Sequence, residues 1–581
     1  MKSKELKKFA NLKFSSHSIE VDQLILSVLD SIEFFKTQKD SSQLSNGLQQ
    51  FNLHLEKLSK IANTLENAAR ECDYDINSPG NGYWSYIHSF NCAIKIMQNT
   101  FKQMTKNREK ILFNKKFYIK ELDLWNQIFE SLIEICETLL QLREGGDKTV
   151  LFSQDNNWVI LNRLHSTIHQ KAFYGSALGF QCAKSVKPLV NFLASTLVSY
   201  SKWHYSDKHK SIKLLDFPLS TASNKGDVDF CKSFWFMSES PAMHTLPNAL
   251  SDSMDINKIF KIPAEPLKVF SEKFQQHIDI PLPHSHIGIQ PVSCRLLCAR
   301  KREGMLGKKS SSKSLPRSRN LLFHVHGGGW AAQTSKSHEV YLRQWASYLD
   351  CPILSIDYQL APKAPFPRGL EDIYYAYCWA LNNFEYLGTT GEKIVFAGDS
   401  AGANLNSALM IKCIENGVRI PDGLLNIYGI YHVDFLIAPS VCLSLTDPML
   451  PFGLTSNLIK CYGIDKNVIN TDINMNIIGE KDIFKFHDSY LLSPYKAPEE
   501  ILKQFPPTRF LSSILDPLLD DNIEFGKKLR NLGVNTNVDI LQGLYHGFLY
   551  FIKISKDCRD GSLMCAARIK ELFEMQQQQQ H

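Results

Sequence analysis

The sequence predicts an α/β protein whose C-terminal half forms a mostly parallel sheet and whose N-terminal half is mainly α-helical. Apolar residues recur at helical spacing before about residue 205, whereas short apolar runs alternate with helical patterns from Leu321 onwards. The composition, with 44% hydrophobic and 21% charged residues, is that of an ordinary globular protein. A chain of 581 residues is too long for one ordinary domain, so we expect two or three.

The prediction of helices in the N-terminal half depends on apolar residues three and four positions apart. Residues 21–35 and 125–139 both follow this spacing, which puts their apolar side chains on one face of a helix. Residues 173–200 continue the helical pattern, and Pro188 is expected to kink or break it. Residues 206–300, with turns rich in proline, are expected to be irregular.

A basic, serine-rich stretch follows from Arg300 to Asn320, with eight Lys or Arg residues against one Glu. Its low apolar content predicts a solvated, mobile loop. We favour a surface insertion without a special role. Phosphorylation of its serines and contact with lipid headgroups remain the alternatives.

The C-terminal half contains six short apolar runs that predict strands. They are Leu321–Val325, Ile353–Tyr358, Ile394–Ala397, Leu424–Tyr428, Arg509–Ser512 and Asn537–Leu541. Helical patterns fill gaps between them, and this alternation predicts a mostly parallel sheet. We therefore divide the chain into a mainly helical domain at 1–315 and a sheet domain at 316–575. Within the second, residues 431–503 interrupt the rhythm as a cap or extra lobe, and the glutamine-rich tail at 576–581 is expected to be disordered.

The strongest chemical signal is Gly398-Asp399-Ser400-Ala401-Gly402. It follows the apolar run that ends at Ala397 and precedes a helical pattern, and this strand–turn–helix context is what a nucleophile elbow requires. The two glycines leave room for strand and helix to pack closely around the turn. Ser400 is therefore the candidate nucleophile.

A second signal is the glycine turn His326-Gly327-Gly328-Gly329-Trp330, directly after the first predicted strand. Consecutive glycines let backbone N–H groups approach an oxyanion closely, and one such donor is worth about 2.7–4 kcal/mol in acyl transfer. The N–H of Ala401, just after the nucleophile, is the expected complementary donor.

A serine nucleophile needs a base, and the base needs a carboxylate that orients it. Asp516 follows the strand at 509–512, and His546 follows the strand at 537–541. Both therefore lie at strand carboxyl ends, where open α/β sheets place their sites. The chain order Ser400, Asp516, His546 fits the order of nucleophile, acid and base in enzymes with this turn.

Several other residues compete for these roles. Asp520 and Asp521 are interpreted as residues of a helix start, where negative charge is favourable. Asp357 and Asp399 precede the expected place of the acid, and Asp447 in Leu-Thr-Asp-Pro-Met-Leu mimics the Asp516 motif without the strand–helix context. His326 is expected to brace the glycine turn. His165 and His169 lie four apart on a helix, but no carboxylate partner accompanies them, so no metal site is predicted.

The sequence shows no sign of export or of a membrane span. The basic start is followed by no apolar core, no apolar stretch of about 18 residues occurs, and the 14 cysteines have no repeated spacing. Free thiols in the reducing cytosol are therefore expected. A net charge of +6 is small for this length and gives no reason to expect a nucleic-acid partner.

These motifs together resemble the hormone-sensitive lipase family of α/β-hydrolases. The resemblance lies in H-G-G-G-W at 326–330, I-D-Y-Q-L-A-P-K-A-P-F-P at 356–367, G-D-S-A-G-A-N at 398–404, L-D-P-L-L-D-D at 515–521 and H-G-F at 546–548. Residues 173–181 resemble the N-terminal region of animal-type members. Trp330 and Ala403 depart from the Phe and Gly that are frequent in the family, and neither change removes a catalytic group.

The resemblance implies the fold and the site residues. It implies an α/β-hydrolase sheet in the C-terminal domain, with Ser400, Asp516 and His546 as nucleophile, acid and base. The oxyanion donors implied are Gly328, Gly329 and Ala401, with His326, Gly327, Gly398 and Gly402 as supporting motif residues. It implies no metal and no organic cofactor.

The resemblance also implies hydrolysis of neutral lipid esters, namely diacylglycerol, triacylglycerol and cholesteryl esters. It implies a cytosolic protein that associates peripherally with lipid droplets and forms a homodimer. The segment 451–490 is far shorter than the regulatory module of the vertebrate enzyme, so hormonal control by that route is not expected. Two alternatives stay open, a carboxylesterase for small soluble esters and an inactive lipid-binding scaffold.

Overall fold

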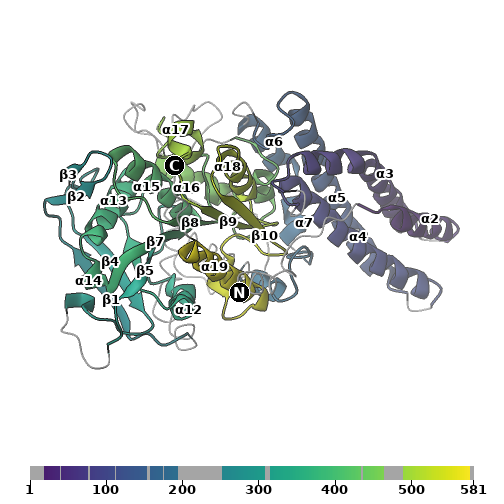
Figure 1. The fold of residues 1–581 in the computed structure, drawn as a ribbon. Helices are drawn as coiled ribbons and strands as arrows, with labels where there is room; N and C mark the ends of the chain where they lie inside the picture. The colour runs from purple at the N-terminus through teal and green to yellow at the C-terminus, as the bar shows by residue number, and fades with distance from the viewer. Residues whose placement is uncertain are drawn as a thin grey trace, which may run out of the picture.

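The computed structural model describes residues 19–38, 41–75, 79–110, 113–153, 158–174, 176–193, 196, 251–307, 314–433, 436–463 and 488–575. Long helices from the first part of the chain extend to one side of a sheet that is covered by helices on both faces (Figure 1). The predicted class, a mostly parallel α/β domain preceded by a mainly helical region, is confirmed.

Helices α2 to α7 make up most of the described N-terminal region. They are α2 (Asp22–Lys36), α3 (Ser42–Glu71), α4 (Gly82–Asn107), α5 (Lys115–Glu144), α6 (Trp158–Thr167) and α7 (Gln170–Tyr174). The predicted helices at 21–35 and 125–139 correspond to α2 and to part of α5. Phe51 of α3 lies 5.0 Å from Phe129 of α5 and 5.9 Å from Phe101 of α4, measured between ring centroids. These aromatic contacts join three helices through their apolar faces.

The sheet of the described residues has eight strands in the order β1-β4-β6-β5-β7-β8-β9-β10. The strands are β1 (Ile256–Ile262), β4 (Val292–Cys298), β5 (Ser318–Val325), β6 (Ile353–Asp357), β7 (Thr389–Asp399), β8 (Gly423–Ile427), β9 (Thr508–Ser513) and β10 (Thr536–Leu541). Six neighbouring strands, β6, β5, β7, β8, β9 and β10, are parallel to one another. At the β6 edge, β4 pairs antiparallel with β6, and β1 pairs antiparallel with β4. All six predicted strands are confirmed.

Helices cover both faces of this sheet (Figure 1). Helices α12 (Glu339–Leu349) and α19 (Lys556–Glu574) lie on one face, and α13 (Arg368–Leu381), α15 (Ala401–Asn416) and α18 (Leu519–Asn531) lie on the other. Shorter helices are α14 (Phe384–Leu387), α16 (Phe452–Gly463) and α17 (Glu499–Leu502). Because both faces are covered, the central strands are buried along their whole length, as in β8 and β9.

Residues 206–300 were expected to be irregular, and this was wrong for residues 251–300. They contain β1 and β4 of the main sheet and a separate hairpin of β2 (Leu267–Ser271) and β3 (Gln276–Ile280). The main sheet therefore begins at Ile256, about 60 residues before the predicted boundary between the two domains at residues 315 and 316. The division into these two domains stays a prediction. The rest of the expected irregular segment lies outside the described residues.

Two further expectations need correction. The helical pattern at 173–200 ends with α7 at Tyr174, residues 176–186 form turns, and helix resumes at Lys187 with Pro188 in its first turn. Proline is tolerated there because the N–H it lacks would have no partner in the helix. The stretch from Arg300 to Asn320 is not a free loop at either end. Arg300 and Arg302 at its start both form ion pairs with Asp350, and residues 318–320 at its end belong to β5. Residues 308–313 lie outside the described part.

Polar contacts join the N-terminal region to α18 and to β10. Asp520 accepts the N–H of Gly82 at 2.7 Å and that of Ser440 at 2.7 Å. Lys527 donates to the carbonyl of Thr149 at 2.7 Å, and the hydroxyl of Tyr74 donates to the carbonyl of Thr536 at 2.7 Å. Asp520 and Asp521 do open a helix as expected, and Asp520 also binds the two halves of the chain together.

No helix in the described part of the chain is both long enough and apolar enough to cross a lipid bilayer.

Candidate active site

Ser400 occupies a strained turn between β7 and α15. Its backbone has φ 54° and ψ −123°, a conformation that costs a residue with a side chain about 1–3 kcal/mol. A Cβ at Gly402 would lie 2.1 Å from the carbonyl oxygen of Val325, and one at Gly398 would lie 2.7 Å from Gly402. Only glycine fits at these two positions, and this is the packing reason for the G-x-S-x-G pattern.

Ser400, His546 and Asp516 form a continuous hydrogen-bonded series. The Oγ of Ser400 lies 3.0 Å from Nε2 of His546, and Nδ1 of His546 lies 3.0 Å and 3.1 Å from the two carboxylate oxygens of Asp516. Asp516 is fully buried. With Nδ1 donating to Asp516, Nε2 is free to accept the hydroxyl proton of Ser400.

Electrostatics favour the protonated form of His546. Burial alone would lower the pKa of this imidazole, but the carboxylate of Asp516 outweighs burial and raises the pKa above its ordinary 6.5. Asp447 and Asp399 act in the same direction as Asp516. A base with this environment holds the proton that it takes from a serine hydroxyl.

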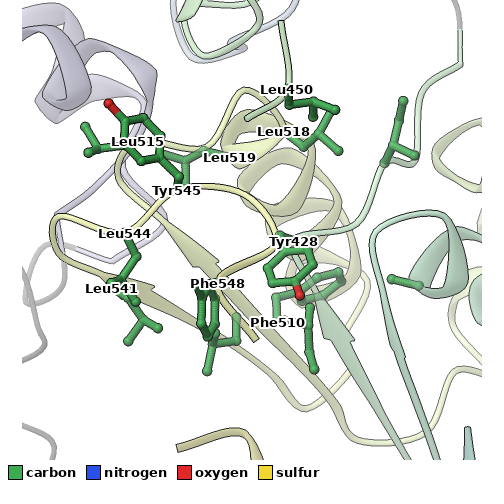
Figure 2. Close-up of a cluster of buried hydrophobic side chains, with 14 of the residues drawn as sticks. Tyr428, Leu450, Phe510, Leu515, Leu518, Leu519, Leu541, Leu544, Tyr545 and Phe548 are labelled. Carbon is green, nitrogen blue, oxygen red and sulfur yellow. The ribbon is translucent and has the colours of Figure 1, made fainter. Parts of the chain in front are cut away.

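Loops at the carboxyl ends of β9 and β10 bring the acid and the base together. Apolar side chains next to Asp516 and His546 pack into one cluster with Tyr428 from the end of β8 (Figure 2). Phe548 lies 5.3 Å from Tyr428, and the ring of Tyr428 lies 4.7 Å from that of His546. Oδ1 of Asp516 also accepts the N–H of Leu518 at 2.8 Å, which fixes the carboxylate at the start of α18.

The glycine turn after β5 lies beside the nucleophile turn. Among the described residues, no hydrogen bond uses the N–H of Gly328 or Gly329, whereas the N–H of Gly327 is bound by Asp399 and His338. Gly328 and Gly329 have φ of 100° and 58°, and Ala401 is the first residue of α15. Backbone N–H groups at such a turn and at a helix start suit a developing negative charge.

The buried carboxylate of Asp399 connects these two turns, and sequence reasoning did not assign it this function. It accepts hydrogen bonds from the N–H of Gly327 and from the hydroxyl of Tyr341, both at 3.1 Å, and from that of Tyr550 at 3.3 Å. Nε2 of His338 lies 3.2 Å away. Burial alone would raise the pKa of Asp399, but His338 and the hydroxyl of Tyr341 outweigh it and keep this pKa below its usual range.

His326 contacts the glycine turn that the sequence analysis expects it to brace. Its Nδ1 lies 2.8 Å from the carbonyl oxygen of Gly327, and its ring stacks on Tyr358 with centroids 4.4 Å apart. Burial lowers the pKa of His326 to about 3, so the ring is neutral.

Asp447, the closest mimic of Asp516, lies near the site but outside the hydrogen-bonded series. Its Oδ1 accepts the N–H groups of Met449 at 2.5 Å and Leu450 at 2.7 Å. Burial, with a further contribution from Asp516, raises the pKa of Asp447 to about 7. The geometry therefore favours Asp516 as the partner of His546.

The other rival residues have structural contacts. Asp357 accepts the N–H and hydroxyl of Ser335 at 2.6 Å and 3.0 Å. The ring of His165 lies against Phe452, and His169 lies 3.2 Å from Glu130. Within the described residues, no three His, Cys, Asp or Glu side chains are grouped so as to hold a metal ion.

Helix α16 covers the glycine turn from the inserted segment. The indole of Trp330 stacks on Tyr462 with centroids 4.6 Å apart and planes 2° apart. A Cβ at Gly329 would lie 2.5 Å from Leu458, so glycine allows α16 to approach this closely. The departure from Phe to Trp330 thus adds contact area to α16.

The N-terminal region also reaches the loop that carries His546. The N–H of Ala183 donates to the carbonyl of Gly543 at 3.0 Å, and the hydroxyl of Tyr174 donates to the carbonyl of Asp447 at 3.2 Å. A Cβ at Gly543 would lie 2.5 Å from the backbone nitrogen of Ala183. The base loop is thus packed tightly between β10 and the first part of the chain.

The fold and the geometry of the site define an α/β-hydrolase with a serine, histidine and aspartate triad arrangement. Two family descriptions match the chain, "Hormone-sensitive lipase (HSL) N-terminus" over residues 20–306 and "alpha/beta hydrolase fold" over residues 322–550. The chain belongs to the hormone-sensitive lipase family.

Relatives in this family are similar over most of the chain. Hormone-sensitive lipase of Mus musculus is 33% identical over 477 residues, which is 74% of this chain and 62% of the relative. That of Homo sapiens is 31% identical over 512 residues, 80% of this chain and 47% of the relative. The chain thus spans only about half to three fifths of the length of these relatives.

Two more distant similarities are to esterases. An arylesterase of Saccharolobus solfataricus is 28% identical over 255 residues, 44% of this chain and 75% of the relative. The solved esterase of the archaeon Pyrobaculum calidifontis is 20% identical, covers 67% of this chain and 98% of its own, and has a TM-score of 0.47.

Proposed function

We propose that the protein is a serine hydrolase that cleaves carboxylic esters of neutral lipids. The observation that carries this proposal is the series from Ser400 Oγ through His546 to Asp516, with hydrogen-bond distances of 3.0–3.1 Å. A nucleophile, a base and an orienting carboxylate in this order are what acyl transfer through a serine ester requires.

In the first half of the reaction, Ser400 Oγ attacks the ester carbonyl while His546 takes the hydroxyl proton at Nε2. The carbonyl oxygen becomes an oxyanion, which accepts hydrogen bonds from the N–H groups of Gly328, Gly329 and Ala401. His546 then protonates the leaving alcohol, the bond between the carbonyl carbon and that alcohol breaks, and an acyl-serine ester remains.

In the second half, water attacks the acyl-serine. His546 takes a proton from the water, the same N–H groups hold the second oxyanion, and His546 returns a proton to Ser400 Oγ as the carboxylic acid leaves. Asp516 stays ionised throughout and holds the imidazole in its productive orientation. The residues present account for each proton, so the proposed reaction needs no cofactor.

The neutral-lipid substrates, diacylglycerol, triacylglycerol and cholesteryl esters, are proposed from the relatives named hormone-sensitive lipase. Support from the chain is the N-terminal region matched at 20–306, which a hydrolase of small esters does not need. From the same resemblance we propose a cytosolic protein that binds the surface of lipid droplets peripherally and forms a homodimer. Relatives named arylesterase and esterase support soluble esters as the second candidate substrates.

The experiment that separates these candidates compares the purified chain on a diolein emulsion and on a soluble acetate ester. We expect a higher kcat/KM on diolein, with a rise in rate above the concentration at which the lipid forms an interface. Turnover confined to the soluble ester would identify a small-ester carboxylesterase. Turnover of neither, with the folded protein present, would support the inactive scaffold.

A further inference from the structure

A small cavity lies where the N-terminal region, the inserted segment and the Asp516 loop meet. Its walls include Phe152 and Leu161 from the first part of the chain, Phe452 and Ile459 from α16, and Ile430 and Leu518 from the loops after β8 and β9. The cavity holds about 40 Å³. One water needs about 10–15 Å³ on this scale, so the cavity has room for a short run of methylene groups and not for a fused ring system.

Three polar side chains of the cavity wall already bond within the protein. The hydroxyl of Ser444 donates to the carbonyl of Val441 at 2.6 Å, and that of Ser456 donates to the carbonyl of Gly453 at 3.2 Å. Oδ1 of Asp521 accepts the N–H groups of Tyr431 and His432 at 2.8 Å and 3.0 Å. An occupant therefore finds apolar surface, which favours hydrocarbon over a polar headgroup.

The cavity wall is close along the chain to the Asp516 loop and to the end of β8. The wall residue Leu518 lies two residues after Asp516, and the wall residue Ile430 lies three residues after Ile427. The carbonyl of Ile427 accepts the N–H of Ser400 at 2.9 Å. An extended chain spans at most about 3.3–3.6 Å per residue, so these wall residues lie within roughly 7–11 Å of Asp516 and Ile427. Helix α16 contacts the glycine turn through Leu458 and the cavity through Phe452 and Ile459.

We propose that this cavity takes the distal part of the substrate's acyl chain, and that Leu161 and Phe152 of the N-terminal region help to set chain-length preference. This inference rests on the proposed function of the same site. The chain would run from the acyl-serine carbonyl past the loops after β8 and β9 and end against α6. Specificity would then be set on both sides of the boundary between the two halves of the protein.

The test measures the ratio of kcat/KM for p-nitrophenyl octanoate to that for the acetate. Ser456→Leu adds bulk to the wall, and we expect it to lower this ratio about tenfold, the usual effect of a changed methylene fit. Leu161→Ala and Phe152→Leu remove bulk, and both should raise the ratio for decanoate over octanoate. Because Phe152 is only half-buried, its variant keeps the test valid if Leu161→Ala does not fold.

The matched control is Leu164→Ala, which removes a fully buried leucine of the same helix that does not line the cavity. It should lower the melting temperature as Leu161→Ala does and leave both ratios unchanged. The proposal would be overturned if the ratios changed equally in the control and the cavity variants, or if they changed in none of these variants. Ester turnover by the wild type would still support the proposed function in either case.

A binding measurement tests the cavity without turnover. The fluorescent fatty acid cis-parinaric acid should bind Ser400→Ala, and adding Ser456→Leu should weaken its Kd about tenfold, by the same loss of fit. An unchanged Kd would overturn the proposal even if the protein hydrolyses no ester.

Discussion

The carboxylate of Asp399 accepts the backbone N–H of Gly327 at 3.1 Å and so joins the nucleophile turn to the glycine turn. The same carboxylate lies 3.2 Å from Nε2 of His338 in a fully buried pair. Ser400 and Ala401 follow β7, whereas the other proposed oxyanion donors, Gly328 and Gly329, follow β5, and Asp399 holds the two turns in one arrangement. Preorganisation of this kind is what a turn that stabilises an oxyanion requires.

Asp399→Asn should therefore disturb both the fold and the reaction. The amide offers one acceptor oxygen in place of two, so donors that Asp399 now satisfies among Gly327, Tyr341 and Tyr550 lose their partner, and one unsatisfied buried group costs about 1–3 kcal/mol. We expect a loss of this order in the free energy of unfolding, measured in urea, and a fall in kcat of at least tenfold in the protein that remains folded. Asp357→Asn is the control, a half-buried carboxylate at the end of β6 that accepts hydrogen bonds from Ser335, and it should affect stability without the fall in kcat. Equal kcat in both variants would remove Asp399 from this role.

Asp516→Asn should lower kcat by about 10⁴, the loss seen when a triad carboxylate becomes an amide. Asp447→Asn should lower kcat less, because Asp447 accepts its hydrogen bonds from the backbone and only adds to the charge around His546.

The pH dependence of kcat/KM gives a second comparison. His546 works as a base when it is neutral, and its raised pKa places the fall of kcat/KM on the acidic side above pH 6.5. Removing the Asp447 charge should move that fall to lower pH. If Asp447→Asn lowered kcat as much as Asp516→Asn, the acid would be misassigned.

The stability of the fold should fall as pH rises through the range in which buried carboxyl groups ionise. Burial raises the pKa of Asp521 from 3.8 to about 7, so the folded state holds a proton that the unfolded chain has lost. The stabilisation is complete below about pH 4 and disappears as pH rises through 7. Asp521→Asn keeps an oxygen for the N–H groups of Tyr431 and His432 and cannot ionise. The free energy of unfolding of Asp521→Asn, measured by urea titration at a series of pH values, should vary less between pH 5 and pH 8 than that of the wild type. The same pH dependence in both proteins would contradict the raised pKa of Asp521.

Contact between the two halves of the protein can be tested with a pair of Gly→Ala changes. A Cβ at Gly82 would lie 2.2 Å from the backbone nitrogen of Ser440, so Gly82→Ala should force the halves apart and cost about 1–3 kcal/mol. At Gly47, inside α3, the new Cβ meets only Leu122 at 3.6 Å, and Ala should stabilise by roughly 0.5–1 kcal/mol. Thermal unfolding compares the two. A neutral effect of Gly82→Ala would show that this contact is looser than the geometry indicates.

The parallel strands could be predicted from sequence because buried strands are continuous apolar runs. The edge strand β1 could not, since only the end residues Ile256 and Ile262 of Ile-Asn-Lys-Ile-Phe-Lys-Ile are buried and Asn and Lys interrupt it. Turns at 176–186 were mistaken for helix because the residues are apolar, and they are apolar because Ala177, Leu178 and Phe180 pack into the core.

The candidate site was more predictable than the contacts that support it. Ser400, Asp516 and His546 each follow a strand, and parallel strands bring their carboxyl ends to one edge. The partners of Asp399 could not be found in this way, because His338 and Tyr550 are far from it in sequence and carry no motif. The cavity wall from Phe152 and Leu161 likewise depends on how the two halves of the chain pack, which no local pattern encodes.

The most direct test of the central claim is labelling by a fluorophosphonate probe, which reacts with an activated serine hydroxyl, together with turnover of a short-chain p-nitrophenyl ester. The wild-type chain should be labelled at Ser400 and should turn over the ester. Ser400→Ala should lose both while its far-UV circular dichroism and melting temperature stay close to wild type, since Ala removes only the hydroxyl. Ester turnover retained by Ser400→Ala, or labelling at another serine, would contradict the account.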